Sequence, residues 1–176
     1  MDPEGARSRG RVLHDEELLL SLLNSAPVIE GVPKDGLDGA AGRDLARRWG
    51  GTGSADEAAR LRRVRQALQS IVRDGDGGAV RELAGILDDA VRTPRVTPDG
   101  VVWELHAPED HRLAAGVVLA WSNVITESPG RLRACANEEC SQFLVDHSRP
   151  GTAKWCSMAV CGNRMKARTH ARRAKS

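Results

Sequence analysis

The chain has 176 residues and a mass of 19.0 kDa, which fits one domain or one domain with a small appendage. Hydrophobic residues make up 40% and charged residues 28%, a balance typical of globular proteins that excludes a disordered chain. Because no apolar run approaches the ~20 residues of a membrane span and no signal-peptide pattern is present, we expect no membrane partner and a reducing, cytoplasmic location.

The formal net charge of +2 hides an asymmetry between the two parts of the chain. Residues 131–176 carry ten Lys and Arg against three Asp and Glu and hold all four cysteines, whereas residues 1–130 carry 16 against 21. A basic segment favours nucleic acid or another anionic surface as its partner, and the alternative is a solvated tail. The sequence therefore predicts a flexible N-terminus at 1–11, a helical domain at 12–130 and a basic module at 131–176.

Apolar periodicity predicts that the first domain is mainly α with a small β-hairpin, an α+β fold. A first helix is expected from Asp15 to about Asn24, and a long loop rich in Gly and Pro should follow it. After a short helical turn at 44–49, Ser54 and Glu57 match a capping box ahead of the clearest helix in the chain, which Gly75 should end.

The rest of this domain is expected to contain a helix at 79–91, a hairpin at 95–106 and a long helix that begins after Pro108. Since a two-stranded hairpin is marginally stable alone, we expect this one to lie on the helices. Three large apolar side chains are predicted to belong to the core: Trp49, Trp103 and Trp121.

The four cysteines form two C-x4-C pairs with 15 residues between them: Cys135, Cys140, Cys156 and Cys161. Two close pairs can converge on one tetrahedral ion, and four thiolates leave no position for a catalytic water, so we predict one structural Zn²⁺. Disulfides and free core cysteines are the alternatives, and a reducing compartment disfavours disulfides. With zinc as the core of this small module, the side chains expected to shield the thiolates are Phe143, Leu144 and Trp155.

A basic helix should follow the second cysteine pair, capped by Ser157 and containing Cys161. Within it, Arg164, Arg168 and Arg172 recur every four residues on one face, where like charges repel unless a polyanion binds. The phosphates of DNA would relieve this repulsion, and an exposed, frayed tail is the alternative. The candidate DNA contacts are Arg149, Lys154, Asn163, Arg164, Lys166, Arg168, Arg172 and Arg173. Asn163 and Arg164 suit base edges or the backbone of the zinc loop equally.

The run Cys156-Ser-Met-Ala-Val-Cys161-Gly-Asn-Arg164 closely resembles the CGNR zinc-finger family, a group of bacterial transcription regulators. The similarity extends back through Cys135-Ala136-Asn137, Cys140, the stretch from Phe143 to Asp146, and Ser148-Arg149. It implies zinc on the four matched cysteines and DNA binding by the C-terminal module. One departure is Glu138-Glu139, between the first two cysteines, which places two negative charges near any phosphate contact. We therefore expect this loop to face away from DNA.

The first domain resembles ABATE, the domain that accompanies this finger and is described as a stress-induced transcription regulator. Leu19-Leu20-Ser21-Leu22-Leu23-Asn24-Ser25 and Trp49 carry this weaker resemblance.

Together these features predict a bacterial, cytoplasmic and nucleoid-associated transcription regulator that is not an enzyme. Its expected partner is double-stranded DNA, and the helical domain is expected either to bind a small-molecule effector or to form a homodimer. Residues 12–128 contain no phosphate loop or nucleophile motif, and one His/carboxylate cluster is interpreted as surface charge: His106, Glu109, Asp110 and His111. A zinc-stabilised protein-interaction adaptor and an RNA-binding protein are the alternatives.

Overall fold

The computed structural model describes residues 3–29 and 31–173. The elements in chain order are α1 (Pro3–Leu23), β1 (Val28–Ile29), β2 (Val32–Pro33), α2 (Gly39–Arg48), α3 (Ala55–Asp74), η1 (Gly77–Ala79), α4 (Val80–Leu87), β3 (Val91–Thr97), β4 (Gly100–His106), α5 (Glu109–Glu127), β5 (Leu132–Ala134), β6 (Phe143–Val145), η2 (Met158–Gly162) and α6 (Asn163–Arg173). The strands form three antiparallel ribbons, β1–β2, β3–β4 and β5–β6. The predicted α+β class is confirmed.

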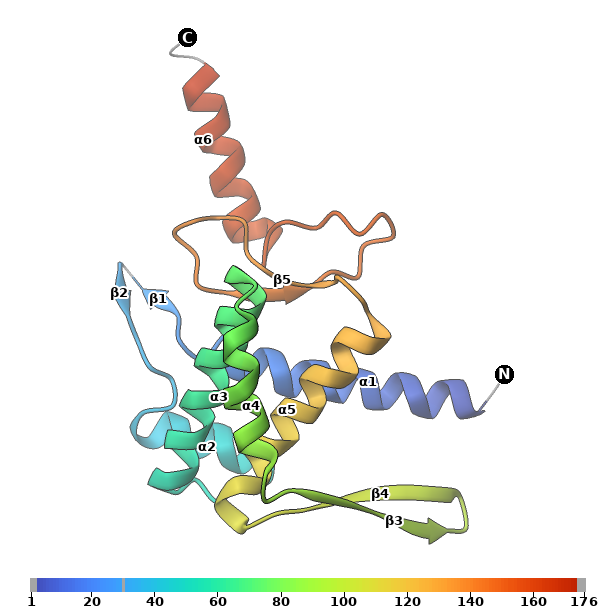
Figure 1. Cartoon of the computed structure of the whole chain (residues 1–176). Coiled ribbons are helices and arrows are strands. Elements are labelled where there is room, and N and C mark those ends of the chain that lie inside the picture. The colour runs from blue at the N-terminus through green and yellow to red at the C-terminus, as the bar shows by residue number, and fades with distance from the viewer. Residues whose placement is uncertain (1–2, 30, 174–176) are drawn as a thin grey trace.

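The helices α1, α3, α4 and α5 pack around one hydrophobic core (Figure 1). Each contributes apolar side chains from one stripe: Leu19, Leu22 and Leu23 from α1, Leu61, Val64 and Leu68 from α3, Leu83 and Ile86 from α4, and Leu113, Val117 and Val124 from α5. The first helix begins at Pro3 and not at the predicted Asp15, so α1 is longer than expected. These first positions carry no apolar stripe and include Gly5 and Gly10, so the sequence gives little sign of a helix there.

The start of α3 follows the predicted capping pattern with one change. Ser54 Oγ accepts a hydrogen bond from the Glu57 backbone N–H at 3.0 Å, and Gly75 ends the helix in the left-handed conformation with φ 69°. The buried Glu57 carboxylate, however, accepts from the backbone N–H groups of Thr52 and Gly53, at 3.2 and 2.8 Å. It therefore fixes the whole loop before α3, and a Cβ at Gly51 would lie 2.5 Å from its Oε1.

The β3–β4 ribbon projects away from the helices, so the prediction that it lies on them is wrong (Figure 1). Its Val96 and Trp103 are 81% and 54% exposed, which also makes the predicted core position of Trp103 wrong. Trp49 and Trp121 are half-buried and pack against the core. The helix expected at 79–91 is shorter, because α4 ends at Leu87 and β3 begins at Val91.

The β5–β6 ribbon, in contrast, is part of the helical core. Phe143 is 2% exposed and belongs to the same cluster of buried side chains as those of α1 and α3. Asn24, at the end of α1, binds both backbone groups of Phe143. Its Oδ1 accepts from the Phe143 N–H at 2.7 Å, and its Nδ2 donates to the Phe143 carbonyl at 3.2 Å. The Arg73 guanidinium of α3 lies 5.0 Å from the centre of the Phe143 ring. The cysteine-rich segment is therefore anchored to the helices beneath it.

Candidate metal centre and basic helix

The four cysteines meet at the base of α6. Cys135 follows β5 and begins the loop at 135–140, here called the first cysteine loop, which Cys140 ends. Cys156 precedes η2, and Cys161 lies within η2. Their sulfur atoms lie within 4.8 Å of one another, and Cys156 Sγ is 3.7 Å from both Cys140 Sγ and Cys161 Sγ. Four sulfurs placed tetrahedrally about 2.3 Å from a Zn²⁺ ion would be separated by about 3.8 Å. The donor set and its spacing therefore fit one zinc ion.

Backbone and side-chain N–H groups support the sulfur atoms. The Cys156 N–H donates to Cys135 Sγ at 3.5 Å, and Asn137 Nδ2 donates to Cys161 Sγ at 3.6 Å. Asn137 is fully buried, and it also shapes the first cysteine loop by accepting from the backbone N–H groups of Glu139 and Cys140. In the sequence, Asn137 stands out only as part of the family resemblance. An asparagine two residues after a cysteine is a turn signal that could have indicated it.

Without metal, the four thiols affect one another strongly. Burial raises the pKa of the Cys156 thiol, and contacts with the neighbouring sulfurs raise it further. Burial likewise raises the pKa of Cys140. At Cys161, burial is outweighed by hydrogen bonds from Asn137 and the neighbouring thiols, which lower its pKa. Because zinc binds thiolates, loading the site releases protons, and four protein ligands make it a structural centre.

Asp146 fixes the loop between the two cysteine pairs. Its buried carboxylate accepts from the Ser148 N–H at 2.8 Å and the Ala153 N–H at 2.9 Å, and Arg133 Nη1 lies 3.5 Å away. Hydrogen bonds from Ser148 are the main reason that the pKa of Asp146 lies below its usual value. Apart from its place in the family resemblance, Asp146 has no sequence signal for this role, since a lone aspartate after a strand is not specific.

The second cysteine pair leads into α6 through η2, one turn of π-helix. Ser157 precedes this turn but makes no side-chain capping bond, so the predicted capping by its hydroxyl is wrong. The Gly162 N–H instead donates to the Ser157 carbonyl at 3.0 Å. A Cβ at Gly162 would lie 2.7 Å from Met158 Sδ, so a larger residue there would displace the methionine side chain. Asn163 Nδ2 donates to the Ala159 carbonyl at 3.3 Å and thereby stabilises the same turn.

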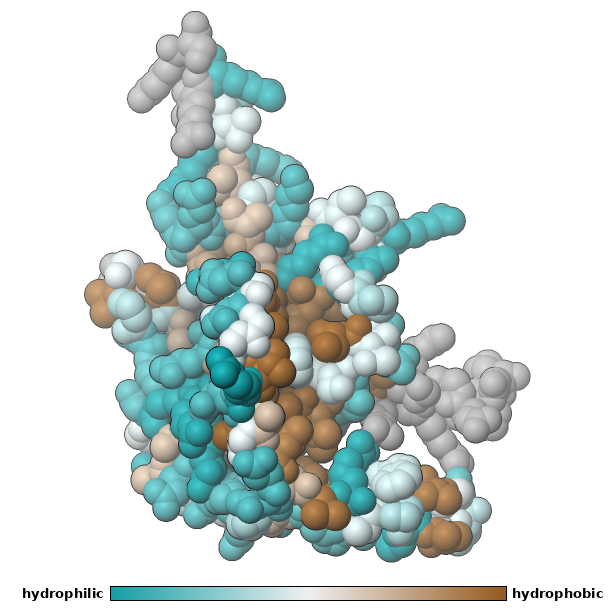
Figure 2. All heavy atoms as spheres, viewed as in Figure 1, coloured by the Kyte–Doolittle hydropathy of each residue, from teal (hydrophilic) through white to brown (hydrophobic). Residues whose placement is uncertain are grey.

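The helix α6 extends away from the helical core, and its surface is mainly hydrophilic (Figures 1 and 2). The candidate DNA contacts whose side chains the structure describes are all exposed: Arg149, Lys154, Asn163, Arg164, Lys166, Arg168 and Arg173. Arg172 belongs to α6, but its side chain lies outside the described residues. Arg168 Nη2 donates to both carboxylate oxygens of Glu139 at 2.6 Å, which lowers the pKa of Glu139.

The His/carboxylate cluster near the start of α5 does not form one site. His106 is hydrogen-bonded to Thr93, and His111 pairs with Asp89. Asp110 accepts from the hydroxyl groups of Thr52 and Ser54, which lower its pKa. Within the described part of the chain, the cysteine cluster is the one group of side chains suited to hold a metal.

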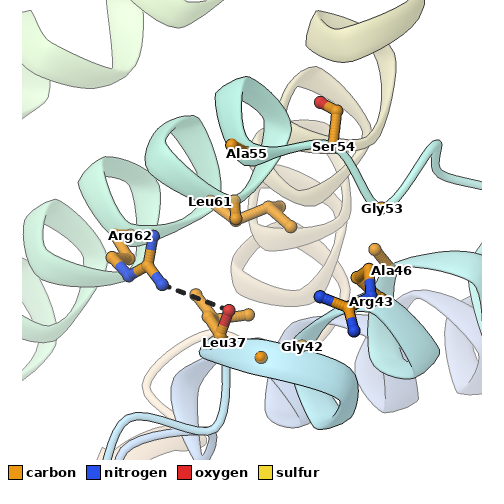
Figure 3. Close-up of a pocket in the computed structure, with 11 residues that line it drawn as sticks. Leu37, Gly42, Arg43, Ala46, Gly53, Ser54, Ala55, Leu61 and Arg62 are labelled. Atoms are coloured by element: carbon orange, nitrogen blue, oxygen red, sulfur yellow. Dashed lines mark hydrogen bonds between the residues drawn. The ribbon is translucent and has the colours of Figure 1, made fainter.

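The helical domain contains a small cavity of about 220 Å³ between α2 and α3 (Figure 3). Arg43 and Arg62 lie at its rim, and Leu61 points into it. Arg62 already pairs with Asp35 at 2.8 Å and donates to the Leu37 carbonyl at 3.1 Å. The cavity is below the roughly 300 Å³ at which sites for small organic ligands begin.

Two family models match this chain. One, ABATE, is described as "Putative stress-induced transcription regulator" and covers residues 16–128, and the other, the CGNR zinc finger, covers residues 131–174. The chain belongs to the ABATE family. In this ABATE protein the zinc finger supplies the four-cysteine centre, and the suspected pairing of the two regions is confirmed. No curated protein matches the sequence. None of the described helices has the length and apolar character needed to cross a membrane.

Proposed function

We propose that this ABATE protein regulates transcription by binding double-stranded DNA through its zinc finger and α6. The observation that carries the proposal is a basic helix that begins at a four-thiolate centre and extends away from the helical domain (Figure 1). A helix so presented can approach a DNA groove without obstruction from the core, and its Arg and Lys side chains can neutralise phosphates. Zinc holds the base of the helix and takes no part in a reaction.

The proposed role of the helical domain is to form a homodimer, which would present two basic helices to two half-sites. Dimerisation suits a DNA-binding module as small as this zinc finger, because two linked modules bind DNA far more tightly than one. Binding of a small effector is the second candidate, and it would require the cavity between α2 and α3 to widen beyond its present volume of about 220 Å³. We propose no catalytic activity, and a location with the chromosome in the bacterial cytoplasm.

The decisive measurement is the affinity of the zinc-loaded protein for a 25-base-pair duplex across a range of salt concentrations. Each neutralised phosphate contributes about −0.9 to the slope of log K against log salt, so four contacts give about −3.6. A slope near zero contradicts DNA binding and favours the protein-interaction adaptor. Tighter binding to single-stranded RNA of the same length favours the RNA-binding alternative. Selection of bound genomic fragments then gives the sequence preference and symmetry of the sites.

A charge-removal variant localises the contact. The triple substitution Arg149→Gln, Lys166→Gln and Arg173→Gln should make the salt slope shallower and lower the affinity at least tenfold. The matched control removes three exposed arginines from the helical domain, Arg47→Gln, Arg48→Gln and Arg81→Gln, and should retain the wild-type slope. Equal losses in the two variants would mean that net charge alone, and not α6, determines binding.

A further inference from the structure

The basic side chains of α6 occupy two opposite faces of the helix. Successive residues of an α-helix are rotated by about 100°, so Arg164 and Arg168 share one face. Lys166, His170 and Arg173 share a face on the far side of the helix axis. Backbone spacing places position 172 with the first group. The two faces carry similar charge in the sequence, and their surroundings decide which one is available to DNA.

The Arg164–Arg168 face is turned toward acidic side chains. Glu139 holds Arg168 through both carboxylate oxygens at 2.6 Å, and the positive charge of Arg164 contributes to the lowered pKa of Glu139. Arg164 also lines a groove of about 610 Å³ together with Glu138, Glu139 and Arg73. This groove runs beneath α6, between the first cysteine loop and the β1–β2 ribbon, and is too small for a duplex. A phosphate approaching this face would meet two glutamates.

The opposite face is open and purely basic. Lys166, His170 and Arg173 are exposed, and no ion pair holds them within the described part of the chain. The loop between the cysteine pairs flanks the base of α6 on the side away from the first cysteine loop (Figure 1), and it carries the exposed Arg149 and Lys154. From residue 147 to residue 176 the sequence contains no Asp or Glu.

We propose that DNA docks on the side of α6 that carries Lys166, His170 and Arg173, next to Arg149 and Lys154. A helix in the major groove, which is about 12 Å wide, has a phosphate backbone on each side, so its flanking loop should be basic. The loop with Arg149 and Lys154 meets this requirement, and the loop with Glu139 does not. Arg168 is then a positioning residue that ties α6 to the first cysteine loop. This inference rests on the proposed DNA binding and names the surface responsible for it.

Two variants with the same loss of charge test the assignment in the full-length, zinc-loaded protein. Lys166→Gln with Arg173→Gln should make the salt slope shallower by about 1.8 and weaken binding to a 25-base-pair duplex by on the order of 50-fold at 0.1 M salt. Arg164→Gln with Arg168→Gln should leave the slope unchanged and the affinity within about threefold of wild type. Zinc content and thermal unfolding, measured on both variants, show whether each remains folded.

A second pair of variants tests the role of Glu139. Glu139→Gln releases Arg168, whereas the control Glu138→Gln removes the same charge next to it without breaking an ion pair. We expect the same salt slope for both. A slope that becomes steeper by about 0.9 in Glu139→Gln alone would mean that the freed Arg168 binds a phosphate, and it would overturn the assignment. A greater loss in the Arg164/Arg168 variant than in the Lys166/Arg173 variant would do so as well. If wild-type protein binds no duplex at low salt, the proposed function itself fails.

Discussion

The β3–β4 and β5–β6 ribbons are built from the same element, two antiparallel strands, yet their surroundings differ completely. The seven-residue strands of β3–β4 extend into solvent, and Figure 2 shows hydrophobic atoms on this projecting ribbon. The three-residue strands of β5–β6 are far shorter, but Phe143, Leu144 and Val145 are all buried. Strand length therefore says little about how well a ribbon is held.

Support from two sides explains the difference. Below β5–β6, the helical core encloses Phe143, and Asn24 binds its backbone N–H and C=O. Beyond the ribbon, Cys135 follows β5 directly and belongs to the metal centre. A single ribbon cannot bury both of its faces, so it depends on what covers it. The comparison indicates that zinc and the helical core together define the base of α6.

Loss of one zinc ligand should produce the largest effect. Cys156→Ser removes the sulfur that lies 3.7 Å from those of both Cys140 and Cys161, and structural zinc contributes about 10–16 kcal/mol of apparent binding free energy. We expect loss of stoichiometric zinc and of the ordered structure of residues 135–173, measured by elemental analysis and amide NMR spectra. The helical domain should remain folded but lose stability where β6 packs on it. Unchanged spectra for the finger would show that the core alone holds it.

Phe143→Ala weakens the contact of the same ribbon with the helical core. Removing a fully buried phenylalanine costs about 3–5 kcal/mol, and here the cavity lies in a core shared by the finger and the helices. Chemical denaturation should therefore show one cooperative transition at lower denaturant concentration, followed by both tryptophan fluorescence and helical circular dichroism. If only the finger loses stability while the helices keep the wild-type midpoint, the two regions unfold independently and the shared core is less important than its burial indicates.

The sequence predicted the parts of this molecule that depend on local signals. The zinc ligands follow from cysteine spacing, and the limits of α3 follow from Ser54, Glu57 and Gly75. The first turns of α1 were missed because they include Gly5 and Gly10 and carry no apolar stripe. In the finger, Asn137 and Asp146 bind backbone N–H groups up to seven residues away, and such contacts leave no periodic pattern in a sequence.

Tertiary packing was the part that sequence could not supply. An alternating strand pattern indicates a ribbon, but it does not say whether a neighbouring apolar face is free to receive it. At β6 the end of α1 and the face of α3 provide one, whereas β3–β4 projects away from the helices. The ion pair between Arg168 and Glu139, which distinguishes the two faces of α6, spans 29 residues and was equally hidden.

The segment after the β1–β2 ribbon, which contains Asp35, lies between these two extremes. Ion pairs of Asp35 help to hold it on the helical domain. The Asp35 carboxylate binds Arg65 at 2.7 Å and Arg62 at 2.8 Å, and the hydrogen bond from Arg65 is the main reason that its pKa is strongly lowered. A carboxyl group with a lowered pKa stabilises the fold above its unfolded pKa of about 3.9, and this stabilisation is lost as the pH falls toward the folded value.

Asp35→Asn should therefore cost about 2 kcal/mol near neutral pH, since it leaves the buried Arg65 without a charged partner. The difference in unfolding free energy between wild type and variant should stay constant above about pH 5 and shrink as the pH is lowered below 4. Urea denaturation at a series of pH values measures it. A difference that grows in acid would contradict the sign, and the network would then owe its strength to something other than the ionised carboxylate.

The smallest effect is expected at the projecting ribbon. Trp103 is 54% exposed on the face that it shares with Val96, so Trp103→Ala removes only a partly buried side chain and should lower the free energy of unfolding by about 1 kcal/mol. Phe143→Ala in the same denaturation series is the matched aromatic comparison. A loss above 2 kcal/mol for Trp103→Ala, larger at higher protein concentration, would mean that another molecule covers the ribbon in solution. In that case both ribbons would depend on structure that packs against them. The β5–β6 ribbon would be covered by its own chain, and the β3–β4 ribbon by a second molecule.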